Sequence, residues 1–141
     1  YQLETAMGSL IEQLPGSQCL HVERNRFFPV KTTSDLLACR AFSAEVGLSQ
    51  LGSYTDALPQ IQLSEEYRFE RDFSNRILVA PSISQLKSFK LDGPLKMGAN
   101  VILKGDVWIE SRCEGYLLED QVLDNAHYII DENGDVAKYP I

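Results

Sequence analysis

Apolar side chains recur at the spacing of an amphipathic helix near the start of the chain. Apolar residues three and four positions apart lie on one helix face, and Leu3, Met7 and Leu10 keep this spacing. The pattern predicts a helix over residues 2–14, ended by the Pro-Gly pair that follows. The sequence begins inside this pattern and without Met, so we expect the chain to be cut from a longer protein.

A short strand and an extended loop are expected after this helix. Residues 18–22 (QCLHV) form a short apolar run, which predicts a buried strand. Pro29 disfavours helix at Phe28, so residues 27–30 are expected to be extended. Helix, strand, loop and helix in this order indicate an α/β layer architecture.

The sequence then shows the start of a second helix. Thr32 followed by Asp35 resembles a capping box, with Asp in place of the usual Glu. We expect the helix to run from about residue 33 to residue 46 and to end at Gly47.

Two shorter elements are expected before residue 80. The QIQL segment at 60–63 predicts a strand. Ser64 can cap a charged helix over residues 65–74, which would place Phe69 and Phe73 on one face.

From residue 89 onward, apolar residues recur every six positions. Small residues, among them Gly93, Gly98 and Gly105, lie between the repeats. Two interleaved six-residue series are typical of a parallel β-helix built from hexapeptide rungs, and the alternative is an antiparallel meander with accidental spacing. Near the end, the DENGDV segment holds an Asn-Gly turn that can close a hairpin. The two series are Phe89, Leu95, Val101 and Val107, and Leu91, Met97, Leu103 and Ile109.

Charge divides the chain into two parts. Of 20 acidic and 13 basic residues, ten acidic and four basic residues lie in 91–141, which predicts a domain boundary near residue 80. We therefore expect an α/β piece over 1–80 and a β-helix over 81–141. The acidic balance argues against binding to nucleic acid or to an anionic membrane. Three cysteines without metal-ligand spacing predict a reduced, cytoplasmic protein.

Lys31 is the strongest candidate for a functional side chain. It precedes the predicted second helix, whose dipole places positive potential at the same point. Two positive features side by side favour an anion between them, so Lys31 and the first N–H groups of the helix are predicted to bind a phosphate. The alternative is a solvated lysine in a surface loop. For the neighbouring Arg24 and Arg26, we expect one structural ion pair and one solvated side chain.

The two histidines and the acidic C-terminal segment are weaker candidates. His21 lies in the predicted strand 18–22, where a hydrogen-bonded structural histidine is expected. His127 lies in the predicted β-helix, an architecture in which acyltransferases use a histidine as base, but no partner motif accompanies it. The DENGD segment resembles the first ligands of a calcium loop. Its sixth position is Val136 where that loop requires glycine, so we dismiss a calcium site.

Two segments resemble a known enzyme family. QLETAMGSLI at 2–11 and HVERNRFFPVKTTSDLL at 21–37 are similar, in this order and spacing, to the C-terminal third of eukaryotic-type UDP-glucose pyrophosphorylase (UTP–glucose-1-phosphate uridylyltransferase). The resemblance is loose over 38–80, and the tail after about residue 113 departs from the family pattern. It implies the terminal portion of a nucleotide-binding Rossmann-like domain followed by a left-handed parallel β-helix.

The resemblance also implies a reaction. These enzymes join UTP and glucose 1-phosphate with Mg²⁺, giving UDP-glucose and pyrophosphate, and Lys31 matches the family lysine that reaches the phosphates. The family's glycine-rich nucleotide loop, uracil-binding residues and metal-binding aspartate belong to an earlier part of the chain. We therefore expect Mg²⁺ to be bound by residues outside these 141, and this polypeptide alone to be inactive. The expected partners are the remainder of its own chain or another subunit, and further copies joined through the β-helix.

Two alternative functions remain open at this point. The chain could be a non-catalytic β-helix assembly module whose α/β piece is scaffolding. It could also be a hexapeptide acyltransferase, which predicts a deep cleft beside His127.

Overall fold

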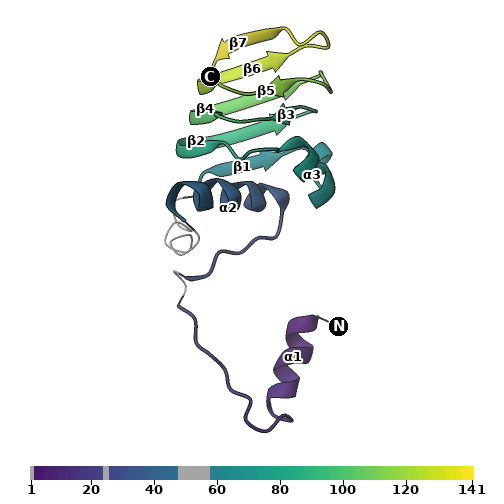
Figure 1. The fold of residues 1–141 in the computed structure, drawn as a ribbon, viewed down its shortest axis with the longest axis vertical. Coiled ribbons are helices and arrows are strands. Elements are labelled where there is room, and N and C mark those ends of the chain that lie inside the picture. Colours follow the sequence, from purple (N-terminus) through teal and green to yellow (C-terminus); the bar gives the residue numbers. More distant parts are fainter. Residues whose placement is uncertain (1, 24–25, 48–57) are drawn as a thin grey trace.

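A five-stranded, mostly parallel sheet forms the centre of the computed structural model, which describes residues 2–23, 26–47 and 58–141. The strand order is β1-β2-β4-β6-β7 (Figure 1). The first four strands pair in parallel, and β7 pairs antiparallel to β6. Two short strands, β3 and β5, form a second parallel pair. The strands are β1 (Gln60–Leu63), β2 (Ser82–Asp92), β3 (Lys96–Met97), β4 (Ile102–Ser111), β5 (Leu117–Leu118), β6 (Val122–Ile130) and β7 (Val136–Pro140).

Helices occupy the first half of the chain, so the fold is a mixed α/β fold. The second helix, α2, lies beside the β1 end of the sheet, and α1 lies apart from the sheet (Figure 1). Within the described residues, no helix is long and apolar enough to cross a membrane. The helices are α1 (Leu3–Ile11), α2 (Thr33–Val46), the 3-10 helix η3 (Glu65–Tyr67) and α3 (Glu70–Arg76).

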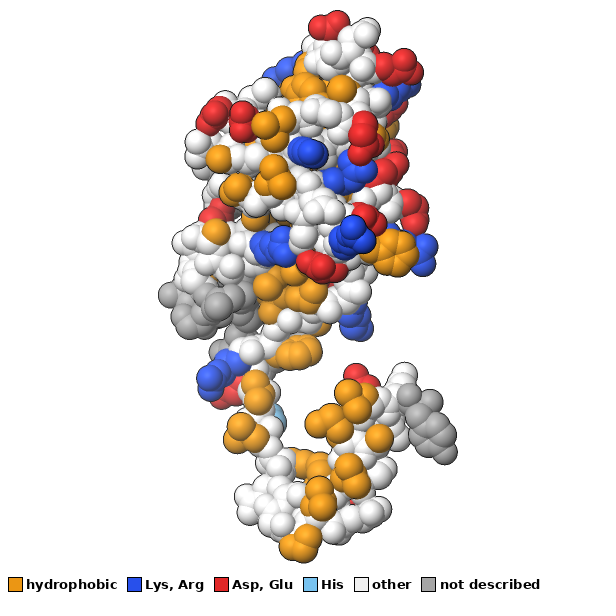
Figure 2. Space-filling model, turned by 45° about the vertical axis from the view of Figure 1, so that its right-hand side comes forward, with side chains coloured by type: hydrophobic (Ala, Val, Ile, Leu, Met, Phe, Trp, Pro, Cys, Tyr) orange, Lys and Arg blue, Asp and Glu red, His pale blue; other side chains and the backbone are white. Residues whose placement is uncertain are grey.

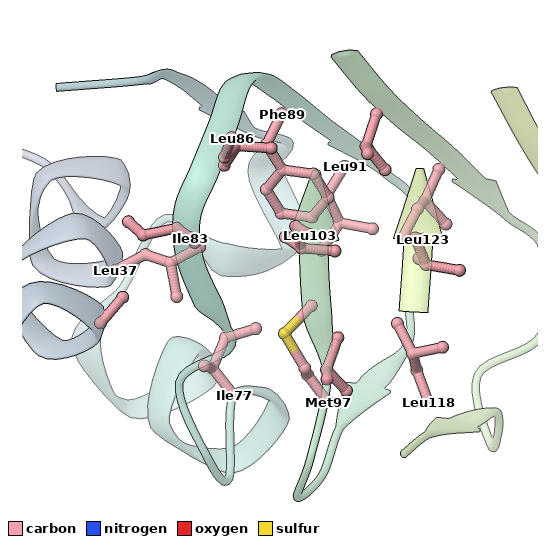
Figure 3. Packing of buried hydrophobic residues seen from close by; sticks show 14 of the residues in the cluster. Leu37, Ile77, Ile83, Leu86, Phe89, Leu91, Met97, Leu103, Leu118 and Leu123 are labelled. Carbon is pink, nitrogen blue, oxygen red and sulfur yellow. The ribbon is translucent and has the colours of Figure 1, made fainter. Parts of the chain in front are cut away.

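The six-residue apolar series forms the core of the stacked strands. Phe89 on β2 lies beside Val107 on β4, and Leu91 lies beside Ile109. Positions three repeats apart are therefore neighbours across the sheet. All eight positions of the two series are buried, and several of them meet in one cluster with the side chains of α2 and β6 (Figure 3). The parallel pairing of β2, β4 and β6 rules out the antiparallel meander.

The bends before β4 and β6 contact each other through two residues with similar backbone geometry. Asn100 and Asp120 both adopt positive φ angles, of 57° and 52°, at the bends before β4 and β6. The Asn100 side-chain amide donates a hydrogen bond of 2.7 Å to the Asp120 carboxylate. Asn and Asp tolerate this left-handed backbone better than other non-glycine residues, so the corner residues suit their positions.

The second helix has the bounds expected from the sequence. It spans Thr33–Val46, begins with the Thr32–Asp35 capping box and is followed by Gly47 at a φ of +82°. In the last turn of α2, the Glu45 carboxylate accepts hydrogen bonds from the Ser82 hydroxyl (2.6 Å) and the Ile83 N–H (2.9 Å). These two contacts attach the end of α2 to the start of β2.

Three expectations from the N-terminal half are wrong. Residues 18–22 form no strand and are exposed, as is His21, because no described strand pairs with them and a buried parallel strand needs neighbours. The predicted helix 65–74 divides into η3 and α3, because Phe69 caps α3 in an extended conformation (φ −93°, ψ 144°). Phe73 is buried whereas Phe69 is 65% exposed.

The first helix is present but carries no buried residue. It spans Leu3–Ile11, a shorter span than expected. Its apolar face lines an open hollow of about 680 Å³ together with Leu14, and apolar side chains gather on this N-terminal part of the surface (Figure 2).

The C-terminal hairpin is confirmed. The segment after β6 turns at Asp131–Asp135, and β7 returns antiparallel, with His127 opposite Tyr139. Asp131 accepts hydrogen bonds from the N–H groups of Asn133 (2.8 Å) and Asp135 (3.0 Å). The carboxylate thus stabilises a turn, as aspartate often does. These N–H donors hold the pKa of Asp131 below its usual value.

Candidate functional site

The start of α2 holds Lys31 directly before the helix. Thr32 is the residue before the first turn, with an extended backbone (φ −128°, ψ 166°), and its hydroxyl accepts a hydrogen bond of 3.2 Å from the Asp35 N–H. Helix geometry leaves the N–H groups of Thr33 and Ser34 without partners inside the helix. The Lys31 side chain and two free helix N–H groups therefore meet in one region.

Asp35 is hydrogen-bonded to this same segment. One of its carboxylate oxygens accepts from the Lys31 N–H (2.9 Å), the Thr32 N–H (2.8 Å) and the Thr32 hydroxyl (2.9 Å). Partial burial acts to raise the pKa of Asp35, but these donors and the nearby Lys31 charge together hold the pKa below its usual value. Asp35 therefore already places one negative charge beside the positive start of α2.

A cavity of about 740 Å³ opens at this helix start. It contains two cationic side chains, Lys31 and Arg68, and two acidic ones, Asp35 and Glu65. The Lys31 ammonium makes no ion pair with a described acid, whereas Arg68 pairs with Glu65 at 3.2 Å on an exposed surface. The cavity is lined by Lys31, Thr32, Thr33, Ser34, Asp35, Ile61, Gln62, Leu63, Ser64, Glu65 and Arg68.

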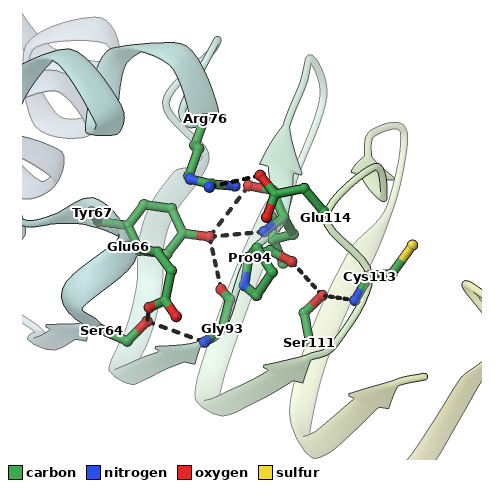
Figure 4. Close-up of polar contacts among 10 residues, drawn as sticks. Ser64, Glu66, Tyr67, Arg76, Gly93, Pro94, Ser111, Cys113 and Glu114 are labelled. Carbon is green, nitrogen blue, oxygen red and sulfur yellow. Dashed lines mark hydrogen bonds and ion pairs between the residues drawn. The ribbon is translucent and has the colours of Figure 1, made fainter. Parts of the chain in front are cut away.

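The far wall of the cavity is fixed by β1 and by Tyr67. β1 pairs with the C-terminal half of β2, and the Ser64 N–H donates to the Leu91 carbonyl at 3.0 Å. The buried Tyr67 hydroxyl donates to the Gly93 carbonyl (3.2 Å) and accepts from the Leu95 N–H (3.2 Å) (Figure 4). Burial raises the pKa of Tyr67. These contacts hold η3, and with it Arg68, against the sheet.

A second polar group joins α3 to the segment that follows β4. Arg76 forms an ion pair of 2.7 Å with Glu114 (Figure 4), and the Arg76 side chain is largely buried, with 18% exposed. Ser111, a buried polar residue, donates its hydroxyl hydrogen bond to the Pro94 carbonyl. The cavity wall therefore rests on the turns that follow β2 and β4.

The other sequence candidates do not join this site. Arg24 lies outside the described residues, and Arg26 and His21 are exposed. Among the residues that the structure describes, no group of three or more His, Cys, Asp or Glu could hold a metal ion. The acidic turn after β6 engages its own backbone, as described above.

His127 lies on the outer face of the sheet. Its ring stacks on Trp108 of β4, with the ring centroids 3.8 Å apart and the planes 7° from parallel. Its Nε2 atom is 3.8 Å from a Glu110 carboxylate oxygen and is buried without a hydrogen bond. None of the cavities described here is lined by His127. The cavities lined by the described residues therefore give no support to an acyltransferase cleft beside it.

Sequence reasoning missed Arg68 and Glu65. Both residues follow β1 in the 3-10 turn, more than thirty positions after Lys31, and no spacing rule joins them to it. The sequence predicts only a charged helix over residues 65–74 at this point. The packing of α2 against β1 and β2 brings this turn to the start of α2.

The residues that line the cavity lie within a segment that matches a known family. The model of the UTP–glucose-1-phosphate uridylyltransferase family matches residues 1–104. The chain belongs to this family. The chain is 36% identical over 129 residues to the UTP–glucose-1-phosphate uridylyltransferase of Pyrus pyrifolia, covering 89% of the chain and 27% of that enzyme. The Hordeum vulgare enzyme is 35% identical over 115 residues, covering 79% of the chain and 24% of the enzyme.

Solved structures give the same result. The UDP-glucose phosphorylase of Trypanosoma brucei superposes with a TM-score of 0.65 at 30% identity, covering 88% of the chain and 29% of that protein. An L281D variant of the Leishmania major UDP-glucose pyrophosphorylase in complex with UDP-glucose superposes with a TM-score of 0.63 at 28% identity, covering 92% and 29%. The chain spans about a quarter of the length of the relatives it matches.

Proposed function

We propose that this chain forms part of a uridylyltransferase that makes UDP-glucose and pyrophosphate from UTP and glucose 1-phosphate. The observation that carries the proposal is the position of Lys31. It lines a cavity at the start of α2, inside the segment that matches the uridylyltransferase family. Lys31 is the residue that we assign to the reaction.

Lys31 would bind phosphate oxygens and offset the charge that develops on them. Phosphoryl-transfer chemistry depends mainly on positioning and on electrostatic stabilisation. The ammonium is not paired with a described acid, and the N–H groups of Thr33 and Ser34 add donors typical of phosphate sites at helix starts. The exposed Arg68–Glu65 pair contributes little to stability, so Arg68 is available as a second cation.

Mg²⁺ belongs to the proposed reaction but not to this chain. The described residues offer no cluster that fits a metal ion. When bound, Mg²⁺ would supply charge neutralisation at the phosphates, and we assign its ligands to the part of the protein outside these 141 residues. UTP and glucose 1-phosphate are likewise proposed to bind mainly there, so we expect this chain alone to be inactive.

We further propose that residues 81–141 form a left-handed β-helix domain, in which the parallel strands β2, β4 and β6 build the stack and the antiparallel β7 closes its end. Supporting evidence comes from a register shift in each long pairing: β4 against β2 and β6 against β4. Gly105 and Asn125, with φ angles of 62° and 39°, lie at the shift between β4 and β6. A bend there would divide each long strand into two straight segments, and the short strands β3 and β5 would supply a third.

The β-helix proposal predicts that one coil can be removed. In a solenoid each coil contacts only its neighbours, so deleting residues 102–121 should leave a folded, cooperative protein. Deleting half of that coil, residues 102–111, should abolish cooperative unfolding. Equal effects of the two deletions would argue against a coil as the structural unit.

The division near residue 80 and the assembly partners also remain proposals. We assign residues 1–80 to the nucleotidyltransferase domain, with β1 as the strand that joins it to the stacked coils. The exposed apolar face of α1, including Met7, Leu10 and Ile11, fits a surface covered by the rest of the enzyme. We propose homo-oligomers through the β-helix. A cytoplasmic location agrees with three free cysteine thiols.

The experiment that tests the function uses a complete enzyme. Residues 1–141 are joined to the remaining three quarters of the Hordeum vulgare relative, in place of its matching segment. UDP-glucose formation from UTP and glucose 1-phosphate is then measured. We expect activity from the joined protein and none from residues 1–141 alone. A correctly folded joined protein without activity would contradict the proposal and would favour a non-catalytic assembly module.

A further inference from the structure

Asp35 contacts the backbone of Lys31 in a way that helix capping does not require. In a capping box, the side chain at the third helical position reaches back to one N–H, that of the residue before the helix. Asp35 makes this contact with Thr32 at 2.8 Å. It also accepts from the N–H of Lys31, one residue earlier, at 2.9 Å.

The additional bond fixes the residue that carries the ammonium. Asp35 holds Lys31 and Thr32 through three donors on one carboxylate oxygen. This sets the direction in which the Lys31 side chain leaves the backbone. A lysine side chain is flexible, so its backbone is the part that the protein can fix before substrate binds.

We propose that Asp35 is a positioning residue for Lys31: its carboxylate binds the Lys31 N–H and thereby directs the ammonium into the cavity. This inference rests on the proposed function of Lys31. Asp35 touches neither substrate nor the reacting atoms in this proposal.

The geometry separates this role from simple charge pairing. Asp35 lies beside Lys31, but the ammonium and the carboxylate form no ion pair, whereas backbone N–H groups bind one of the carboxylate oxygens. The ammonium is therefore left for an external anion. A displacement of about 1 Å in a positioning group can cost about 100-fold in rate, so a looser backbone at Lys31 should reduce turnover.

A double-mutant cycle in the complete enzyme tests the proposal. The four proteins are the unmodified enzyme, Asp35→Ala, Lys31→Ala and the double variant. We expect Asp35→Ala to lower kcat about tenfold with little change in KM, because positioning matters most in the transition state. In the Lys31→Ala background, Asp35→Ala should change kcat by less than about twofold, because residues that act through one another are not additive.

A control separates catalysis from stability. Glu45→Ala removes two hydrogen bonds at the opposite end of the same helix and should destabilise α2 without lowering kcat. If Asp35→Ala does not fold, Asp35→Leu replaces it in the cycle, since leucine has a side chain of similar shape but no oxygen to accept the Lys31 N–H.

The outcomes distinguish this inference from the proposed function. Full kcat in Asp35→Ala, or an equal loss with and without Lys31, would overturn the positioning role. Full kcat in Lys31→Ala would instead overturn the role of Lys31 itself. Loss of kcat in Glu45→Ala equal to that in Asp35→Ala would show that Asp35 acts only through the stability of α2.

Discussion

Gly93→Ala is expected to be strongly destabilising. Gly93 follows β2 at a φ of +80°, a backbone conformation that L side chains rarely adopt. A methyl group there would lie 1.9 Å from the Ser111 carbonyl oxygen, far inside the 3.4 Å of ordinary contact. The neighbouring atom belongs to the backbone of β4, so it cannot rotate away.

The expected magnitude has two parts. A non-glycine residue in the left-handed region costs about 1–2 kcal/mol. Moving Gly93 away from β4 would also weaken its bonds to the Ser64 hydroxyl (3.1 Å) and the Tyr67 hydroxyl (3.2 Å), each contributing about 1 kcal/mol. The free energy of unfolding should therefore fall by about 3–4 kcal/mol, among the larger effects of single substitutions.

Urea unfolding followed by circular dichroism measures this loss. Two other glycines serve as matched controls. Gly115 lies at an ordinary φ with open space around it, so Gly115→Ala should change stability by less than about 0.5 kcal/mol. Gly47 has a φ of +82°, a ψ of 154° and open space, so Gly47→Ala should cost only the conformational part, about 1–3 kcal/mol.

The order of the three variants tests the reasoning. If Gly93→Ala costs no more than Gly47→Ala, the close approach between the turn and β4 does not exist in solution. The stacking described here would then be wrong at this corner.

Three further predictions concern the core, the α2 anchor and pH. Val101→Asp places an unpaired charge at a 2%-exposed site and should cost about 3–5 kcal/mol in urea unfolding, whereas Asp at the neighbouring outward-facing Ile102 should cost less than about 1 kcal/mol. Glu45→Ala leaves the Ile83 N–H without its acceptor and should cost about 1–2 kcal/mol, with Glu12→Ala on an exposed segment as control. The lowered pKa of Asp35 means that its contribution is present above the unfolded value and is lost as pH falls through the lower folded value. Acid titration of stability should therefore show a smaller loss for Asp35→Asn, and an unchanged acid profile would contradict the hydrogen bonds assigned to this carboxylate.

Regular patterns could be predicted from the sequence because they depend on local geometry. The capping box at Thr32 and Asp35 and the end at Gly47 define α2 without reference to the rest of the chain. The six-residue period predicted the burial of these side chains, since equivalent positions on neighbouring parallel strands have the same environment. The Asn-Gly turn predicted the hairpin of β6 and β7, because the geometry of such a turn depends on its own residues.

Elements that depend on distant partners could not be predicted in this way. The apolar segment 18–22 looks like a strand, but none of the described strands pairs with it. Phe69 and Phe73 have helical spacing, yet an extended break at Phe69 places only Phe73 in the core. Arg68 reaches the candidate site because α2 packs against β1 and β1 pairs with β2, which are contacts between segments far apart in the sequence.

The most direct test of the central claim is the turnover of the complete enzyme with and without Lys31. Lys31→Ala should lower kcat about 10²–10³-fold, the cost of removing one donor that stabilises transition-state charge, and should leave the unfolding midpoint nearly unchanged because the side chain is exposed. Arg26→Ala, an exposed cation five positions earlier, should retain full activity. Unmodified turnover in Lys31→Ala would contradict the account.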